Sequence, residues 1–244
     1  MHFTNTLGRN VPSESFLDRV LSLAMPVFCV SSFLIYTMKT VVKVAHFMHF
    51  KELIACCVLM AGSAQANDVG ITKGLMNVTV QTADGVVDIT RNQDPNARLQ
   101  EPWTQTSRPC PNFCIQPMIP APGVAPVGEL EVLEFLQRED AVLVDGRLRT
   151  DYDKSTIPGA ISIPYTQAAD RLDELGCEID FDGWICSDAA PIVVLFCNGP
   201  WCGQSPTAAR RMIAAGYPAK KIRYYRGGMQ SWNMLGLTVR PGSG

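Results

Sequence analysis

The stretch that most constrains the fold is an apolar run that ends in a cysteine. Residues 191–196 are rich in Val, Ile and Leu, and such a short run predicts a strand buried on both faces. Cys197 follows directly. A helical pattern begins at Thr207, with Ser205 as the expected N-cap and Pro206 at the first helical position. This order predicts a strand, a loop and a helix of an open α/β sheet.

The loop between this strand and this helix has the features of a reactive-cysteine site. Ligands bind at the carboxyl ends of the strands in open α/β sheets. Loop N–H groups and the helix dipole favour an anion there, and a thiolate is an anion. Cys197 is therefore the candidate nucleophile, and the alternative is a cysteine that is simply buried at a strand end. The rest of the candidate active-site loop is Asn198, Gly199, Pro200, Trp201, Cys202, Gly203, Gln204 and Ser205.

Two segments near the N-terminus predict export. Residues 20–38 are apolar, uncharged and long enough to span a bilayer. Residues 48–66 combine Lys51, an apolar core and an Ala-x-Ala site, which is typical of a secretory signal peptide cut after Ala66. Either the true start is Met48 and residues 1–47 are an over-long gene model, or residues 20–38 are retained as a membrane anchor. The folded part is then periplasmic or secreted, or anchored facing the periplasm, and disulfides are permitted.

Histidine is absent after the predicted cleavage site, because the three histidines are His2, His46 and His49. A mature chain from Asn67 therefore excludes Ser-His-Asp and Cys-His catalysis and a His-ligated zinc site. No Cys-x-x-Cys-His is present, which excludes c-type haem. We expect no cofactor. A net charge of −2 without a basic stripe argues against a nucleic-acid partner.

Four further cysteines form two closely spaced pairs. Cys110 and Cys114 lie among prolines, and this pair is interpreted as a local disulfide, half of a metal site or two free thiols. Cys177 and Cys186 flank a polar loop, and their separation suits a disulfide. A soft-metal site would require the first pair to meet the cysteines of the active-site loop in space: Cys110, Cys114, Cys197 and Cys202.

The rest of the chain divides at about residue 127. Residues 67–126 hold a predicted hairpin around Asp84-Gly85, interpreted as a small β extension outside the main domain, and a Pro-rich linker over 119–127. Residues 127–244 alternate strands and helices, which predicts a parallel sheet flanked by helices on both faces. The expected elements are helices at 128–136 and 168–175, strands at 141–145 and 221–225, a turn into another short strand over 156–164, and a last helix holding Met229, Trp232 and Leu235.

This order of features resembles the rhodanese family of single-domain sulfurtransferases. Four motifs carry the resemblance, in chain order: Asp145-Gly146-Arg147, Ile157-Pro158-Gly159-Ala160, Cys197, and Gly227-Gly228 followed by Trp232 and Gly236. Thr156 stands where the family usually has His. The segment from Cys110 to Cys114 and the Cys197 loop look like an exported bacterial subgroup of this family.

The resemblance implies a rhodanese-like fold and a persulfide mechanism. The Cys197 thiolate would attack the outer sulfur of a donor such as thiosulfate, the loop amides would hold the persulfide, and a thiophilic acceptor would take the sulfur. Arg147 would brace the loop or attract the anion, or form a structural salt bridge with Asp145. The loop is longer than is usual and lacks the Arg or Lys that many members use to receive thiosulfate. The Cys-x5-Arg of rhodanese-like phosphatases is not met, because Gly203 occupies the Arg position.

Cys202 favours a second class of function. Its thiol is placed to resolve a persulfide or sulfenate on Cys197 by forming a disulfide, which would make the protein a thiol–disulfide redox or binding module with a protein partner. A permanent Cys197–Cys202 disulfide would instead silence the loop. Trp201 is then a partner-docking side chain or a lid over the sulfur.

Overall fold

The computed structural model describes residues 68–111 and 113–243. The predicted signal peptide at 48–66 and the apolar segment at 20–38 lie outside the described residues. Within the described part, no helix combines the length and the apolar character that crossing a membrane requires.

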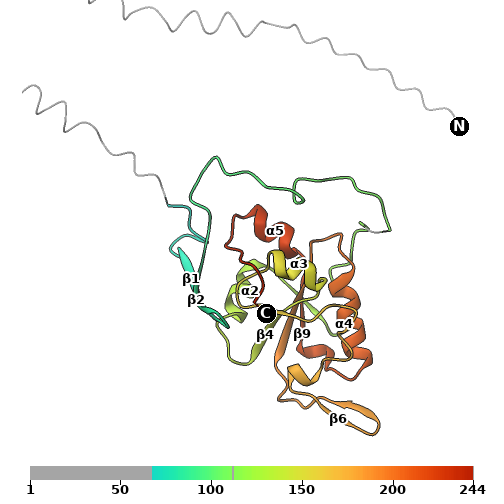
Figure 1. The fold of residues 1–244 in the computed structure, drawn as a ribbon. Coiled ribbons are helices and arrows are strands. Elements are labelled where there is room, and N and C mark those ends of the chain that lie inside the picture. The colour runs from blue at the N-terminus through green and yellow to red at the C-terminus, as the bar shows by residue number, and fades with distance from the viewer. Residues whose placement is uncertain (1–67, 112, 244) are drawn as a thin grey trace, which may run out of the picture. The chain divides into compact units, whose positions relative to one another are not determined.

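The centre of the fold is a five-stranded parallel sheet, which confirms the predicted fold class (Figure 1). The strands follow the order β3-β9-β8-β4-β5, so β8 lies in the middle between β9 and β4. The apolar run that ends at Cys197 is therefore the central strand. The bounds are β3 (Ala125–Val127), β4 (Ala141–Asp145), β5 (Ile161–Ser162), β8 (Ile192–Phe196) and β9 (Ile222–Tyr225).

Helices cover both faces of this sheet. Side chains of β8 alternate between them: Val193 and Leu195 pack in the cluster that includes α4, whereas Val194 and Phe196 pack in the cluster that includes α2 and α5. The helices are α2 (Glu129–Phe135), α3 (Arg149–Lys154), α4 (Gln204–Ala214) and α5 (Gly228–Met234), with 3-10 turns η1 (Asp173–Leu175) and η2 (Ala219–Lys221).

Two hairpins accompany the sheet. The predicted N-terminal hairpin forms as β1 (Asn77–Thr82) and β2 (Gly85–Thr90), in antiparallel register. It does not stand apart from the main domain, because the buried Val78, Val80 and Ile89 join the cluster of α2 and α5. The second hairpin, β6 (Glu178–Asp180) and β7 (Gly183–Ile185), occupies the polar loop between Cys177 and Cys186 (Figure 1).

Three predicted elements differ from the structure. Only η1 forms within the expected helix 168–175, because the Arg171 guanidinium donates to Ser162 O and the Trp184 indole donates to Ala169 O, which holds this backbone in turns. The expected linker contains strand β3, an edge strand that tolerates its proline. The short helix α3 was not predicted.

Candidate active site

Cys197 lies at the carboxyl end of the central strand, where it is 2% exposed and unpaired. The first residues of α5 hold its backbone, because Met229 N–H donates to Cys197 O and Gln230 N–H donates to Asn198 O, both at 2.9 Å. Gly228 makes this approach possible: its φ is +55°, and a Cβ there would lie 2.2 Å from Cys197 O. The Gly-Gly motif that precedes α5 therefore serves to dock this helix on the active-site loop.

Ser205 lies inside α4 instead of capping it. The helix begins at Gln204 with Gly203 as its N-cap, and Thr207 N–H donates to Gly203 O at 3.0 Å. The predicted start was thus two residues late, since Pro206 fits anywhere in a first turn where N–H groups have no intrahelical partner. The consequence is chemical: the amide and hydroxyl of the buried Ser205 face Cys197 and lower the pKa of its thiol.

Cys202 is buried next to Cys197 in the active-site loop. It is 3% exposed and also unpaired, and Cys197 Sγ donates to Cys202 O at 3.2 Å. Burial raises the pKa of Cys197, and the neighbouring Cys202 raises it further. The Cys197 thiol, the amides of Gln204 and Asn198 and the charge of Arg147 lower the pKa of Cys202 against the opposing effect of burial. The pair therefore favours one negative charge and opposes a second.

Asp145 and Arg147 form a buried ion pair beneath the loop. Arg147 Nε and Nη2 donate to Asp145 Oδ1 at 2.9 Å and Oδ2 at 2.6 Å, and the two residues are 2% and 0% exposed respectively. Thr156 Oγ1, at the position where the family usually has His, donates to Asp145 Oδ2 at 2.8 Å. Arg147 Nη1 reaches Asn198 Oδ1 at 3.5 Å. Arg147 is thus both a structural ion-pair partner and a brace of the loop.

Two buried hydroxyls near Cys197 have no well-formed hydrogen bond in the described structure: Ser205 Oγ and Tyr224 Oη. Tyr224 lies on β9, directly beside Leu195 of β8. Burial raises the pKa of Tyr224, and the charges of Cys197 and Cys202 raise it further, so its proton is retained near neutral pH. The site therefore contains donor capacity that the resting protein does not use.

A segment far upstream lies against the outer side of the loop. We call residues 108–111 and 113–116 the strap, in which Cys110 and Cys114 form a disulfide. Arg108 stacks on both aromatic rings, 3.9 Å from the Phe113 centroid and 4.2 Å from the Trp201 centroid. The two rings lie 4.7 Å apart. Trp201 of the loop is thus held by aromatic contacts to the strap.

Hydrogen bonds complete the attachment of the strap. Gln116 N–H donates to Pro200 O at 2.8 Å, and Arg226 Nε donates to Gln116 O at 2.9 Å. Trp201 Nε1 also donates to Gln230 Oε1 on α5. The loop is therefore held from two sides, by α5 and by the strap.

The structure brings the predicted loop residues together around Cys197, and it supplies the cations that the loop itself lacks. These are Arg108, Arg147 and Arg226, of which only Arg147 was predicted. No sequence signal identified the other two, since each belongs to a segment distant from the loop. Tyr224 was placed in a predicted strand, but its hydroxyl was not assigned to the site.

The cysteine pairs separate into two kinds. Cys110 is bonded to Cys114 and Cys177 to Cys186, whereas Cys197 and Cys202 are unpaired. The soft-metal arrangement of four cysteines is wrong for this structure, because the first pair is consumed by its disulfide. Over 68–111 and 113–243, no group of three or more His, Cys, Asp or Glu side chains is arranged to hold a metal ion.

Comparison with known proteins finds a family match within the second half of the chain. Residues 130–235 match the rhodanese-like domain. The chain is 35% identical over 113 residues to an HTH-type transcriptional regulator of Mycobacterium tuberculosis, over 45% of this chain and 43% of that protein, so it spans less than half the length of this relative.

Solved structures with some likeness to the chain include two sulfurtransferases. The thiosulfate sulfurtransferase of Pseudomonas aeruginosa is 24% identical with a TM-score of 0.38, over 49% of this chain and 21% of that chain. The human single-domain sulfurtransferase is 23% identical with a TM-score of 0.36, over 46% of this chain and 96% of that chain.

Proposed function

We propose that this chain, whose residues 130–235 form a rhodanese-like domain, is a sulfurtransferase that moves sulfane sulfur through a persulfide on Cys197. The donor is a small sulfur-containing anion such as thiosulfate, and the acceptor is a thiophile. The observation that carries the proposal is the Cys197 thiol, unpaired at the end of the central strand and facing donors of Ser205.

The chemistry requires an anionic sulfur to be stabilised twice. The Cys197 thiolate attacks the outer sulfur of thiosulfate, a sulfur–sulfur bond forms, and sulfite leaves as the bond inside thiosulfate breaks. The negative outer sulfur of the persulfide then needs hydrogen-bond donors, which the Ser205 and Tyr224 hydroxyls offer without breaking an existing bond. A thiolate acceptor removes this sulfur and restores the Cys197 thiolate.

An anionic donor suits the charges around the loop. Arg147 lies beneath the loop, while Arg226 and Arg108 are attached to it through the strap. These cations favour the approach of a small dianion.

Export to the periplasm or beyond remains part of the proposal, because it rests on the sequence of residues 48–66.

A second candidate function is a non-catalytic or redox-binding module in which Cys197 and Cys202 exchange between dithiol and disulfide. The observation that favours it is that two unpaired, buried cysteines share one loop, with Cys197 Sγ 3.2 Å from the carbonyl oxygen of Cys202. The relative from Mycobacterium tuberculosis is named a transcriptional regulator, and a binding role for this chain is compatible with that name.

Intact mass after thiosulfate treatment separates the two candidates. In the reduced protein one sulfur atom is expected to pass to Cys197 with release of sulfite, any sulfur that is retained is expected to be removed by cyanide, and Cys197→Ser is expected to gain none. A reduced wild-type protein that gains no sulfur, with Cys197 still open to alkylation, would sink the sulfurtransferase proposal. Removal by cyanide also serves as the control for nonspecific adducts.

A further inference from the structure

We infer that Cys202 is a second catalytic residue, which attacks the Cys197 persulfide, closes a Cys197–Cys202 disulfide and releases the carried sulfur as hydrosulfide. This inference rests on the proposed persulfide at Cys197 and names the fate of its sulfur. The product is then sulfide, and the consumed reductant is a dithiol instead of a small thiophilic acceptor.

The position of Cys202 carries the inference. Both cysteines lie in one short loop and are unpaired, Cys197 Sγ donates to the carbonyl oxygen of Cys202 at 3.2 Å, and Cys202 Sγ donates to Gln204 Oε1 at 3.4 Å. Both are almost fully buried, at 2% and 3% exposure. Cys202 is therefore a nucleophile held in the same buried loop as the atom it would attack, whereas an external thiol must first open the loop.

The environment of Cys202 also suits this role. The amides of Gln204 and Asn198 and the charge of Arg147 favour its thiolate, and thiol–disulfide exchange proceeds through a thiolate. The loop is also held by α5 at Cys197 and by the strap at Pro200, which restricts the movement of the backbone that carries both cysteines. A structural role would explain one buried cysteine, but it leaves the burial of two unpaired thiols in one short loop unexplained.

The step balances without a metal or an electron carrier. The Cys202 thiolate attacks Sγ of the Cys197 persulfide, the new bond joins the two Sγ atoms, and the outer sulfur leaves as hydrosulfide with the persulfide proton. A dithiol then reduces the disulfide by two electrons and returns both protons. The net reaction turns thiosulfate and a dithiol into sulfite, sulfide and a disulfide.

A single turnover without added thiol tests this step. The protein is reduced with dithiothreitol, freed of it without oxygen and mixed with thiosulfate, and then sulfite, sulfide and intact mass are measured. Wild type is expected to release one equivalent each of sulfite and sulfide and to become two hydrogens lighter than the reduced protein. Cys202→Ser is expected to release sulfite alone and to keep the added sulfur until dithiothreitol is supplied.

The outcomes distinguish the failure of this inference from the failure of the proposed sulfurtransferase function. Wild type that keeps its sulfur as a persulfide and releases no sulfide would overturn the role of Cys202 and leave the sulfurtransferase proposal intact. Sulfide release by Cys202→Ser equal to that of wild type would also overturn it. Wild type that neither releases sulfite nor gains sulfur would overturn both.

Two controls keep the result decisive. Wild type without thiosulfate must retain both thiols, so that a Cys197–Cys202 disulfide found by peptide mapping together with sulfide has turnover as its source. This measurement stands even where Cys202→Ser fails to load sulfur. Cys177→Ser combined with Cys186→Ser applies the same chemical change outside the site, and it is expected to release sulfide as wild type does.

Discussion

The strap and the β6–β7 hairpin are both closed by a disulfide, but they are attached to different parts of the molecule. The strap disulfide joins residues four apart, and the strap contacts the loop of Cys197. The hairpin disulfide joins residues nine apart, and Cys177, Cys186 and Trp184 pack in the α4 cluster. Trp184 O lies close to Gly216, beyond the end of α4 that is remote from the loop.

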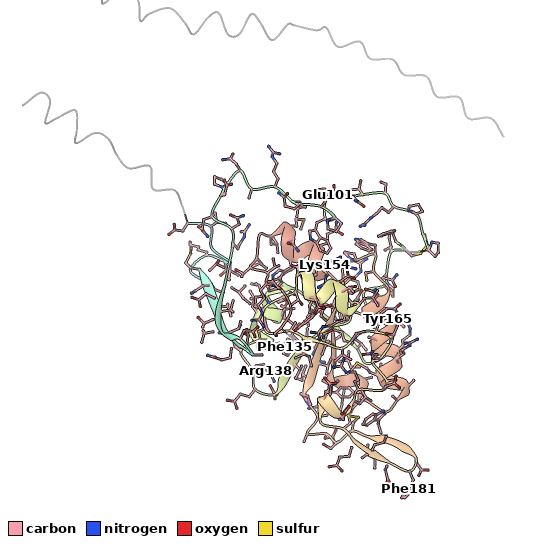
Figure 2. The ribbon with its side chains drawn as sticks, in the orientation of Figure 1. Glu101, Phe135, Arg138, Lys154, Tyr165 and Phe181 are labelled. Atoms are coloured by element: carbon pink, nitrogen blue, oxygen red, sulfur yellow. A yellow bond between two sulfur atoms is a disulfide. The ribbon has the colours of Figure 1, made fainter. Side chains whose placement is uncertain are left out.

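The comparison teaches that the same covalent bond serves two purposes. In the strap, it closes a short turn whose Phe113 ring packs on Trp201 and whose Gln116 N–H donates to Pro200 O. In the hairpin, it fixes an exposed ribbon to apolar side chains, while Phe181 at the tip faces solvent (Figure 2). Loss of the strap bond should therefore alter chemistry more than loss of the hairpin bond does, and stability should follow the opposite order.

The largest effect on stability is expected from Cys177→Ser combined with Cys186→Ser. Opening a loop of this length lowers the free energy of unfolding by about 3 kcal/mol in the chain-entropy description. Urea denaturation followed by tryptophan fluorescence measures the loss, and thiosulfate loading of Cys197 is expected to match wild type. A loss of loading at full stability would show that the hairpin acts on the site and would break the comparison.

A smaller stability effect is expected from Cys110→Ser combined with Cys114→Ser. The shorter loop contributes about 2 kcal/mol to the free energy of unfolding. Because the strap also holds Pro200 and Trp201, the rate of thiosulfate loading is expected to change several-fold, which stopped-time intact mass would record. Loading that equals wild type would show that the strap contacts leave the loop unaffected.

The smallest effect is expected from Arg108→Met, which keeps an unbranched side chain and removes the guanidinium. Loss of its stacking on Phe113 and Trp201 costs about 0.5–1 kcal/mol, or a factor of about two to five in the thiosulfate concentration needed for half-maximal loading. Arg98→Met is the matched control, because Arg98 is exposed. Equal effects of the two changes would assign the loss to net charge alone.

The local parts of the fold were predictable, because short apolar runs and glycine turns encode them. β8, the Cys197 loop and the N-terminal hairpin follow this rule, and the parallel sheet follows from their alternation with helices. The position of the strap was not predictable, because Arg226 and Gln116, which hydrogen-bond to each other, are 110 residues apart in the sequence. The start of α4 was placed late because the pattern marks its apolar face and not its first turn.

Burial of the active-site cysteines sets what a thiol reagent can measure on this protein. Cys197 and Cys202 are 2% and 3% exposed, so any reagent meets protein atoms before it meets sulfur. The observed rate of alkylation is then the intrinsic rate multiplied by the equilibrium constant for local opening, as in amide exchange of a buried N–H. Larger alkylating agents require a larger opening of the loop, so they are expected to react more slowly than small ones. The loop therefore selects the reagents that reach Cys197 by their size.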